Sequence, residues 1–534
     1  MTAGGVEEEA RRRRTFAIIS HPDAGKTTLT EKLLLYGGAL REAGQVSARG
    51  GRKAAVSDWM EMEQARGISV TSTVLRFEHE GTVFNLLDTP GHRDFSEDTM
   101  RVLAAADCAV ILLDAARGVQ EQTRMLFDVA RAREIPLLVF VNKYDRPGME
   151  PLEMLDHIES ELGLVPAPLV WPAGEPGRFV GLLDRRAHTA VALERTPHGA
   201  QEALETEVDL DAPPAAQAEA FGVAADELEL IEGAGEALDL DAFGAGRSTP
   251  VLFGSAMWNF GVRQLLAVLD ELAPSPPPRL LVDGTTRPIT EPFSGQVFKL
   301  QANMDARHRD RLAFVRICSG RFEKGMKAYN ARTGKPIALN HAHDVFGQRR
   351  DLVEEAFPGD VIGISGASDL RVGDTICVTE GITPFVGIPT LAPERLMSAR
   401  ATDATKRKQF RKGLSQLDDE GVVQLIERDA GADPAPILGA VGELQFEGCL
   451  HRMANEFSCP IRLEPTQWAV ARRIDEADAE LVRRQLNADV LHRADGTAMA
   501  VFTSAFWLER FGAEHPDVRL DRVLGDTLAT TVTA

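Results

Sequence analysis

The chain has 534 residues, 44% of them hydrophobic, and its 59 lysines and arginines against 80 aspartates and glutamates give a net charge of −21. Its 46 glycines and 29 prolines are too few for a collagen-like or wholly disordered chain. At about 100 to 200 residues per domain, the length predicts three or four folded domains.

The five cysteines show neither the paired spacing of a zinc site nor a disulfide framework, which fits a reducing compartment. The N-terminus is charged, and no apolar run of about 18 residues occurs, so neither a secretion signal nor a membrane span is predicted. We therefore expect a cytoplasmic protein without membrane partners.

Charge is unevenly distributed along the chain. Residues 200–246 hold 13 acidic residues and no lysine or arginine, whereas residues 299–350 hold 12 basic residues against 4 acidic ones. In an acidic molecule, such a basic stretch indicates a polyanionic partner, with a solvated basic surface as the alternative.

Apolar runs alternate with amphipathic stretches through the first half of the chain. Runs without polar alternation are typical of strands buried on both faces, and they occur at 16–19, 83–87, 109–113, 137–141 and 251–253. Amphipathic helices are expected between them, as where Leu29 and Leu33 share one helical face and where residues 262–272 follow an apolar stripe. This pattern predicts a doubly wound α/β domain.

The expected domains follow from these patterns. After a charged tail (1–14), the α/β domain covers 15–278 and ends where four prolines in 273–278 exclude a helix or central strand. Short glycine-bounded segments predict a β-barrel domain over 279–390. The remainder, 391–534, has a helical pattern at 442–457 and indicates an α+β C-terminal domain.

A candidate phosphate loop follows the first expected strand and precedes a helix. It consists of Ser20, His21, Pro22, Asp23, Ala24, Gly25, Lys26 and Thr27. Backbone N–H groups of such a loop can surround a β-phosphate, Lys26 can reach the β and γ oxygens, and the Thr27 hydroxyl can ligate Mg²⁺. Ser20 stands where the usual pattern has glycine, and by itself the segment could be an ordinary strand-to-helix turn.

A second element follows the expected strand 83–87 and consists of Asp88, Thr89, Pro90, Gly91 and His92. A carboxylate at a strand end beside a phosphate loop suits Mg²⁺, and the Gly91 N–H can approach a γ-phosphate because no side chain blocks it. Taken alone, the segment could be a plain turn.

A third element, Asn142, Lys143, Tyr144 and Asp145, follows the strand 137–141. The Asp145 carboxylate can accept hydrogen bonds from the N1–H and 2-amino groups of guanine, a donor pair that adenine lacks. Ser255 and Ala256 follow the last strand, where a backbone N–H can reach guanine O6. Four elements in this order, each at a strand end, predict a GTP site.

These elements together resemble the translational GTPase family. The similarity includes SHPDAGKTT (20–28), SDWMEME (57–63), RGIS (66–69), LLDTPGHRDFSEDT (86–99) and the segment 298–326. It implies a multidomain chain in which an α/β P-loop GTPase domain carries an inserted subdomain at about 160–248, followed by the β-barrel and α+β domains. About 110 residues between Asp145 and Ser255 leave room for that insert.

The resemblance also assigns roles to single residues. Ser69 would ligate Mg²⁺ together with Thr27 and Asp88, although most members have threonine at its position in the first switch. His92 would orient the water that attacks GTP. Pro22 and Ile68 would form an apolar gate that restrains His92, with ordinary packing as the alternative.

The partners that the resemblance implies are parts of the ribosome. Since no arginine finger stands out, the sarcin–ricin loop of ribosomal RNA would complete the site. Basic side chains would contact RNA phosphates, unless they form solvated faces; they are Arg307, Arg309, Arg311 and Arg316, and more weakly the cluster Lys406, Arg407, Lys408, Arg411 and Lys412. The acidic insert would meet ribosomal stalk proteins or serve as a solubilising surface.

The expected function is that of a monomeric, ribosome-stimulated GTPase that drives stop-codon-reading release factors off the ribosome after peptide release, without reading the stop codon. One alternative is an elongation factor G-like or ribosome-protection GTPase, for whose two further domains 534 residues leave no room. Another is a GTP-gated assembly scaffold, against which the presence of His92 argues.

Overall fold

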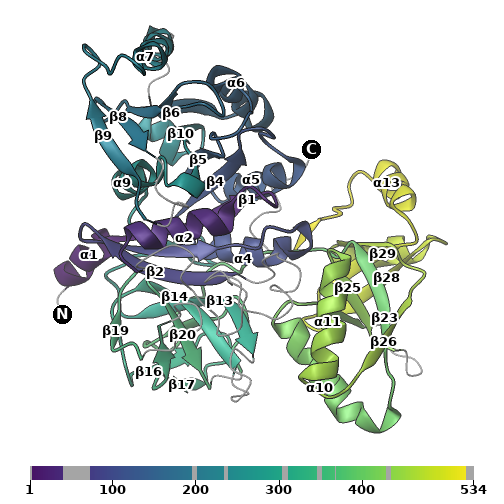
Figure 1. Cartoon of the computed structure of the whole chain (residues 1–534). Coiled ribbons are helices and arrows are strands. Elements are labelled where there is room, and N and C mark those ends of the chain that lie inside the picture. The colour runs from purple at the N-terminus through teal and green to yellow at the C-terminus, as the bar shows by residue number, and fades with distance from the viewer. Residues whose placement is uncertain are drawn as a thin grey trace.

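The computed structural model describes residues 3–39, 72–194, 201–233, 238–302, 311–344, 352–366, 369–427 and 435–524. They form an α/β domain, a β domain below it and an α+β domain beside both (Figure 1). No helix within these ranges is both long and apolar enough to span a membrane.

The first domain is built on a ten-stranded sheet of order β2-β3-β1-β4-β5-β10-β6-β7-β8-β9. The strands are β1 (Arg13–Ser20), β2 (Thr73–His79), β3 (Thr82–Asp88), β4 (Cys108–Asp114), β5 (Leu137–Asn142), β6 (Val165–Ala173), β7 (Gly181–Asp184), β8 (Thr189–Glu194), β9 (Leu204–Val208) and β10 (Ser248–Phe253). The helices are α1 (Ala3–Arg11), α2 (Lys26–Tyr36), α4 (Ser96–Ala105), α5 (Glu121–Ala132), α6 (Pro151–Leu162), α7 (Ala218–Gly233), α8 (Leu240–Gly244) and α9 (Val262–Leu272), with single 3₁₀ turns η1 (Arg93–Phe95) and η3 (Ala256–Trp258).

Strands β3, β1, β4, β5, β10 and β6 pair in parallel. Every apolar run predicted as a strand lies in one of them, and the doubly wound fold is confirmed. In a parallel sheet the carboxyl ends of the strands meet at one edge, and ligands bind there. The segments that follow β1, β3, β5 and β10 therefore gather at that edge.

The expected inserted subdomain extends the central sheet and does not stand apart from it. β6 pairs with β10, and β7, β8 and β9 continue the sheet as antiparallel strands. Trp171 and Phe221 from this region are buried in the same core as the central strands. β6 is buried in all but its first residue, and further strands cover its open edge, so the insert shares the core of the α/β domain.

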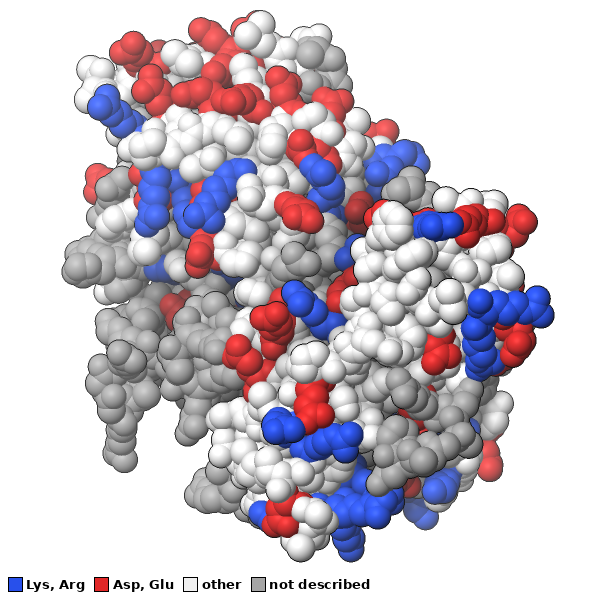
Figure 2. All heavy atoms as spheres, turned by 90° about the vertical axis from the view of Figure 1, so that its right-hand side faces the viewer, with Lys and Arg blue, Asp and Glu red and all other residues white. Residues whose placement is uncertain are grey.

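The acidic residues of this region lie mainly on its outer helix. Glu219, Asp226, Glu229 and Glu232 on α7 are exposed. Figure 2 shows Asp and Glu gathered at the top of the molecule, where α7 lies in Figure 1. A surface of this charge repels phosphate groups.

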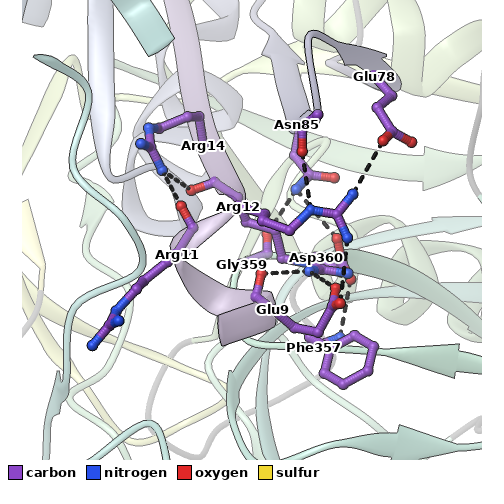
Figure 3. Close-up of polar contacts among 11 residues, drawn as sticks. Glu9, Arg11, Arg12, Arg14, Glu78, Asn85, Phe357, Gly359 and Asp360 are labelled. Carbon is purple, nitrogen blue, oxygen red and sulfur yellow. Dashed lines mark hydrogen bonds and ion pairs between the residues drawn. The ribbon is translucent and has the colours of Figure 1, made fainter. Parts of the chain in front are cut away.

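The N-terminal segment expected as a charged tail forms α1 and the start of β1, and it contacts the second domain (Figure 3). Arg13 is buried, and its Nε lies 2.8 Å from Asp360 Oδ2 while its Nη1 lies 2.8 Å from Glu9 Oε2. The Asn85 amide donates to the Gly359 carbonyl at 3.2 Å. A buried guanidinium needs such partners, so Arg13 serves as a contact between the two domains.

The second domain is the expected β-barrel domain, with a seven-stranded antiparallel sheet of order β17-β16-β21-β13-β14-β20-β18 around an apolar core. These strands are β13 (Ser294–Ala302), β14 (Arg311–Ser319), β16 (Lys327–Asn330), β17 (Pro336–Ala338), β18 (Ala342–His343), β20 (Val361–Ser365) and β21 (Thr375–Cys377). Two short pairs accompany them, β11 (Arg279–Leu280) with β12 (Thr286–Arg287) and β15 (Phe322–Glu323) with β19 (Glu355–Ala356).

Part of the basic stretch faces the first domain, not solvent. The Arg316 side chain is 2% exposed; it forms an ion pair with Asp107 and donates to the Ala105 carbonyl at 2.8 Å. Lys299 is also buried, with its Nζ 3.4 Å from Asp98 Oδ2. The prediction that Arg316 contacts RNA is therefore wrong, since its charge is neutralised inside the protein.

The other predicted RNA contacts of this stretch have different outcomes. Arg311 Nη1 lies 3.4 Å from Asp419 Oδ2 of the third domain, so this side chain also has an internal partner. Arg307 and Arg309 lie outside the described residues. The number of basic residues in a stretch of sequence thus does not show which of them are available to contact RNA.

Arg316→Ala is expected to lower the free energy of unfolding by about 3 kcal/mol, because it leaves the buried Asp107 with fewer charged partners. Arg279, at 2.9 Å from Asp107, keeps the loss from being larger. The matched control is Arg321→Ala, which removes surface ion pairs with Glu323 and Glu355 and should cost less than about 1 kcal/mol. Urea denaturation measures both; equal losses would contradict the assignment of Arg316 to the domain interface.

The third domain has the expected α+β fold. Its seven-stranded sheet has the order β26-β23-β25-β24-β28-β29-β27. The strands are β23 (Arg395–Ala401), β24 (Gln424–Glu427), β25 (Ile437–Ala440), β26 (Ile461–Pro465), β27 (Val470–Arg473), β28 (Ala488–Arg493) and β29 (Ala498–Phe502), and β22 (Thr390–Leu391) pairs with β30 (Val523–Leu524). The helices are α10 (Arg407–Asp419), α11 (Glu443–Asn455), α12 (Ala479–Arg483) and α13 (Ala505–Glu514), with 3₁₀ turns η4 (Ala404–Lys406) and η5 (Glu476–Asp478).

Helix α11 confirms the helix predicted at 442–457. Helix α10 carries the second basic cluster, in which Arg407, Lys408, Arg411 and Lys412 are exposed and Lys406 is half-buried. Basic side chains gather at the lower end of Figure 2, where α10 lies in Figure 1.

Candidate nucleotide-binding site

The candidate phosphate loop lies between β1 and α2, as predicted. Gly25 has φ 98°, in the left-handed region, and a Cβ there would lie 2.4 Å from Asn142 Nδ2. Both the backbone conformation and the space therefore require glycine. The loop approaches the segment after β5 closely, which brings two predicted elements together.

Lys26 and Asp88 form an ion pair at the centre of the candidate site. Lys26 Nζ lies 2.5 Å from Asp88 Oδ1, and the side chains are 7% and 2% exposed. Asp88 ends β3 and is in register with Ile18 on β1, which places it beside the loop. Thr27, the next residue of α2, is partly exposed. A buried cation and a buried carboxylate stabilise each other here, and each is a group that a phosphate or a metal ion can engage.

Three side chains near the loop carry polar groups that have no hydrogen-bond partner among the described residues. They are the Ser20 hydroxyl, both ring nitrogens of His21 and the Thr30 hydroxyl, all of them buried. Burial lowers the pKa of His21, which keeps its ring neutral near pH 7. Because unpaired buried polar groups are costly, this part of the loop suits a bound polar ligand.

The segment after β3 packs against the phosphate loop. The Thr89 hydroxyl donates to the Ile18 carbonyl at 2.6 Å, and Gln122 Nε2 donates to the Gly91 carbonyl at 2.8 Å. A Cβ on Gly91 would lie 3.8 Å from Pro22 Cα. With Pro90 buried next to it, Gly91 faces the loop, as its predicted contact with a γ-phosphate requires.

His92 is partly exposed at the end of this segment, with 34% of its side chain accessible. Its Nδ1 lies 3.2 Å from the Asp94 backbone nitrogen and 3.5 Å from Asp94 Oδ1. The ring is thus held from one side while the rest remains accessible. Ile68 and Ser69, the predicted gate and metal-binding residues of the first switch, lie outside the described residues.

Asn142 connects three of the predicted loops. Its Nδ2 donates to the Ala24 carbonyl at 2.7 Å, and its Oδ1 accepts from the Ala256 N–H at 2.8 Å. Lys143, with φ 64°, donates to the Asp23 carbonyl and lies 2.9 Å from Asp114 Oδ2. These bonds fix the phosphate end of the site relative to its base end.

The pKa of Asp114 is lowered although its carboxyl group is buried. Burial raises the pKa of this carboxyl, but the hydrogen bond from Lys143, the hydrogen bond from the Ala116 N–H and the charge of Lys143 act against burial, and the net effect is a lowered pKa. Asp114 therefore stays ionised and keeps Lys143 in place across the phosphate loop.

Asp145 lies at the base end with its carboxylate already engaged. Its Oδ1 accepts from the Ser255 hydroxyl at 2.6 Å, and its Oδ2 faces Trp258 Nε1 at 3.3 Å. The Tyr144 N–H donates to the Gly254 carbonyl at 3.1 Å, which fixes the two loops side by side. Ser255 and Trp258 thus hold the Asp145 carboxylate in one orientation, with one donor to each oxygen.

Sequence reasoning missed Asp114, Gln122 and Trp258. Asp114 ends β4 beside β1, so the strand-end rule that found Asp88 could have found it too. Gln122 and Trp258 come from a helix and a turn whose side-chain directions depend on the tertiary fold, and no pattern in the sequence indicates them.

Comparisons with known proteins agree with this geometry. Family models match residues 11–275 (Elongation factor Tu GTP binding domain), 292–379 (Elongation factor G domain 2) and 385–512 (Class II release factor RF3, C-terminal domain). A protein of Cyanothece sp. (strain PCC 7425) called peptide chain release factor 3 is 49% identical over 526 residues, 97% of this chain and 96% of that protein. The chain belongs to the peptide chain release factor 3 family. A namesake from Acaryochloris marina is 48% identical over 97% of this chain and 96% of its own.

A crystal structure of a protein from Thermus thermophilus is also similar, with a TM-score of 0.68 and 25% identity over 91% of this chain and 71% of that one. These comparisons confirm the resemblance to the translational GTPases. The first domain is a translational GTPase domain, and guanine nucleotide is its ligand.

Proposed function

We propose that the chain is a ribosome-dependent GTPase that promotes dissociation of stop-codon-reading release factors after peptide release, without itself reading the stop codon. The observation that carries the proposal is the combination of a translational GTPase domain with the C-terminal domain of class II release factors. That C-terminal domain favours this function over an elongation factor G-like translocase. In this proposal the protein acts in the cytoplasm as a monomer.

The phosphates of GTP would bind at the loop of residues 20–27. Lys26 exchanges its bond with Asp88 for the β and γ oxygens, so its charge remains compensated. The unpaired Ser20 and His21 side chains leave polar groups of the loop available to the ligand. Guanine would bind between Asp145 and the N–H of Ala256.

Beside Lys26, the Thr27 hydroxyl and the Asp88 carboxylate fit a Mg²⁺ ion, since hydroxyl and carboxylate oxygens are the ligands it prefers. Thr27, Ser69 and Asp88 would hold it. When bound, it neutralises charge on the β and γ phosphates.

Hydrolysis requires a water held in line with the γ-phosphorus. His92 positions this water. The water oxygen forms a bond to the γ-phosphorus, and the bond between the γ-phosphorus and the β–γ bridging oxygen breaks. The products are GDP and inorganic phosphate, and the phosphate and its surroundings take up the protons of the water. Gly91 stabilises the γ oxygens through its backbone N–H.

The ribosome would complete this site through the sarcin–ricin loop, with the acidic α7 surface directed to the ribosomal stalk proteins. Of the two basic regions, the exposed side chains of α10 suit RNA phosphates better than the buried Arg316 and Lys299. Ribosome binding should accordingly weaken as salt rises.

With GTP, the purified protein is expected to speed the departure of a fluorescently labelled stop-codon-reading release factor from post-release ribosomes, because GTP-bound protein stabilises a ribosome state that the factor binds poorly. Stopped-flow fluorescence measures this rate. Ribosomes with a sense codon in the decoding site serve as a control for protein binding, which should not depend on the stop codon.

Two outcomes decide against the proposal. If the labelled factor left equally fast without the protein while messenger RNA advanced by a codon, the translocase alternative would replace it. If GTP were bound but not turned over on ribosomes, the scaffold alternative would hold.

A further inference from the structure

Asp94 lies between the candidate catalytic histidine and the third domain. It follows His92 by two residues, in the 3₁₀ turn η1, and it is 8% exposed. Its backbone N–H and its Oδ1 both lie near His92 Nδ1, at 3.2 Å and 3.5 Å. The Asp94 N–H donates to His92 Nδ1 and holds the ring, while the carboxylate oxygen lies next to it.

The other carboxylate oxygen of Asp94 is bound to the third domain. Asp94 Oδ2 accepts from the backbone N–H of Leu444 at 2.9 Å, at the start of α11. The N-cap residue of this helix is Gly442, which has no side chain to accept such a bond. A cap normally comes from the N-cap residue itself, so here a carboxylate of another domain takes that place and also faces the positive end of the helix dipole.

Gly442 is shaped to this contact. A Cβ at this position would lie 1.9 Å from Asp94 Cγ. Its φ of −146° is extended and open to any residue, so the backbone itself does not require glycine. The space that Asp94 occupies is what excludes a side chain.

A second contact joins the same segment to the third domain. Arg101 on α4 donates through Nη1 to the Glu420 carbonyl at 2.7 Å, and Gln424 Nε2 lies 3.4 Å from Glu97 Oε2. The chain from Asp94 to Arg101 is thus held at both ends, and a shift of the third domain would displace it.

We propose that Asp94 is a positioning residue that couples His92 to the placement of the third domain. With α11 in the position seen here, Asp94 keeps His92 in the orientation that hydrolysis uses; when the third domain moves away, the cap is lost and His92 is misplaced, which slows hydrolysis. The proposal rests on the role of His92 in the proposed function, and it adds the means by which that role is regulated.

Variants at Asp94 test the coupling by single-turnover GTP hydrolysis on ribosomes. Asp94→Ala removes the cap and is expected to slow hydrolysis roughly 10-fold, in the range for losing one positioning contact. Asp94→Asn keeps an oxygen that accepts from Leu444, so it should restore the rate to within about 3-fold of the unmutated protein. Affinity for GDP in solution should stay the same in all of them, because Asp94 lies outside the phosphate and guanine loops.

Gly442→Ala approaches the same contact from the other domain and should also slow hydrolysis. In an Asp94→Ala background, however, the added methyl group has space, so the double variant should be no slower than Asp94→Ala alone. Gly387→Ala is the matched control, since a Cβ there meets nothing within 4 Å. Multiplicative effects in the double variant, or an unchanged rate in Asp94→Ala, would overturn the proposal.

Hydrogen exchange at the Leu444 amide separates this inference from the proposed function. Asp94→Ala should raise its exchange rate at least about 5-fold, while Asp94→Asn should not, whatever His92 does in catalysis. If His92→Ala kept full activity while Leu444 behaved as expected, the catalytic role of His92 would fail and the domain contact would stand. Unchanged exchange in Asp94→Ala would remove the contact itself. Should Gly442→Ala not fold, the two Asp94 variants still decide.

Discussion

His92→Ala is expected to bind GTP normally and to hydrolyse it on ribosomes roughly 10² to 10⁴ times more slowly, the range for losing a positioned acid–base or water-orienting group. Binding persists because the phosphate and guanine contacts come from other loops; His92 itself contacts Asp94 and is 34% exposed. Single-turnover hydrolysis with radiolabelled GTP and saturating ribosomes measures the chemical step.

Lys26→Ala is the contrasting variant. It removes the cation that the loop directs at the phosphates and leaves the buried Asp88 without that partner, so it should abolish nucleotide binding. A His92→Ala protein that hydrolysed GTP on ribosomes at the unmutated rate would disprove the role assigned to His92.

Asp145→Asn is expected to weaken GTP binding by roughly 10³ to 10⁵ and to favour xanthosine triphosphate, because an amide pairs poorly with the donors of guanine but can donate to the C2 carbonyl of xanthine. The structure adds a reason for the size of the effect. Trp258 Nε1 lies 3.3 Å from Asp145 Oδ2 and is itself a donor, so an amide nitrogen placed there would face another N–H.

Calorimetric titration with both nucleotides measures the reversal. Ser255→Ala provides a control, since it removes the hydroxyl that orients Asp145 but keeps the carboxylate, and it should weaken GTP only modestly without favouring xanthosine triphosphate. Unchanged GTP affinity in Asp145→Asn would mean that this carboxylate does not read the base.

The arrangement of the first domain could be predicted because short segments of the sequence are enough to indicate its strands and loops. Each of the predicted central strands is a mostly apolar run, and each functional loop directly follows one, so the order of motifs along the chain already places them at one edge of the sheet. The ion pair of Lys26 and Asp88 needed only the further fact that β1 and β3 are neighbours.

The partners of charged residues could not be predicted, because they depend on contacts between distant segments. Arg316 is one of 12 basic residues in its stretch, and only the packing of β14 against the first domain shows that Asp107 neutralises it. Nor does a run of arginines after an acidic helix indicate that Arg13 is buried against Asp360. The sequence predicts an insert, but which edge of the sheet β6 to β9 extend likewise depends on contacts between distant segments.

Because Arg13 and Arg316 are buried, their ion pairs should depend little on salt concentration, and this simplifies the interpretation of salt-dependent ribosome binding. Salt screens exposed charges strongly and buried ion pairs weakly. The interface between the first two domains should therefore persist at ionic strengths at which surface contacts with a polyanion are lost. A plot of ribosome affinity against salt concentration would then count only external phosphate contacts, at roughly one unit of slope for each side chain engaged. Buried arginines add nothing to that slope, and substituting the exposed ones on α10 one at a time would map the docking face.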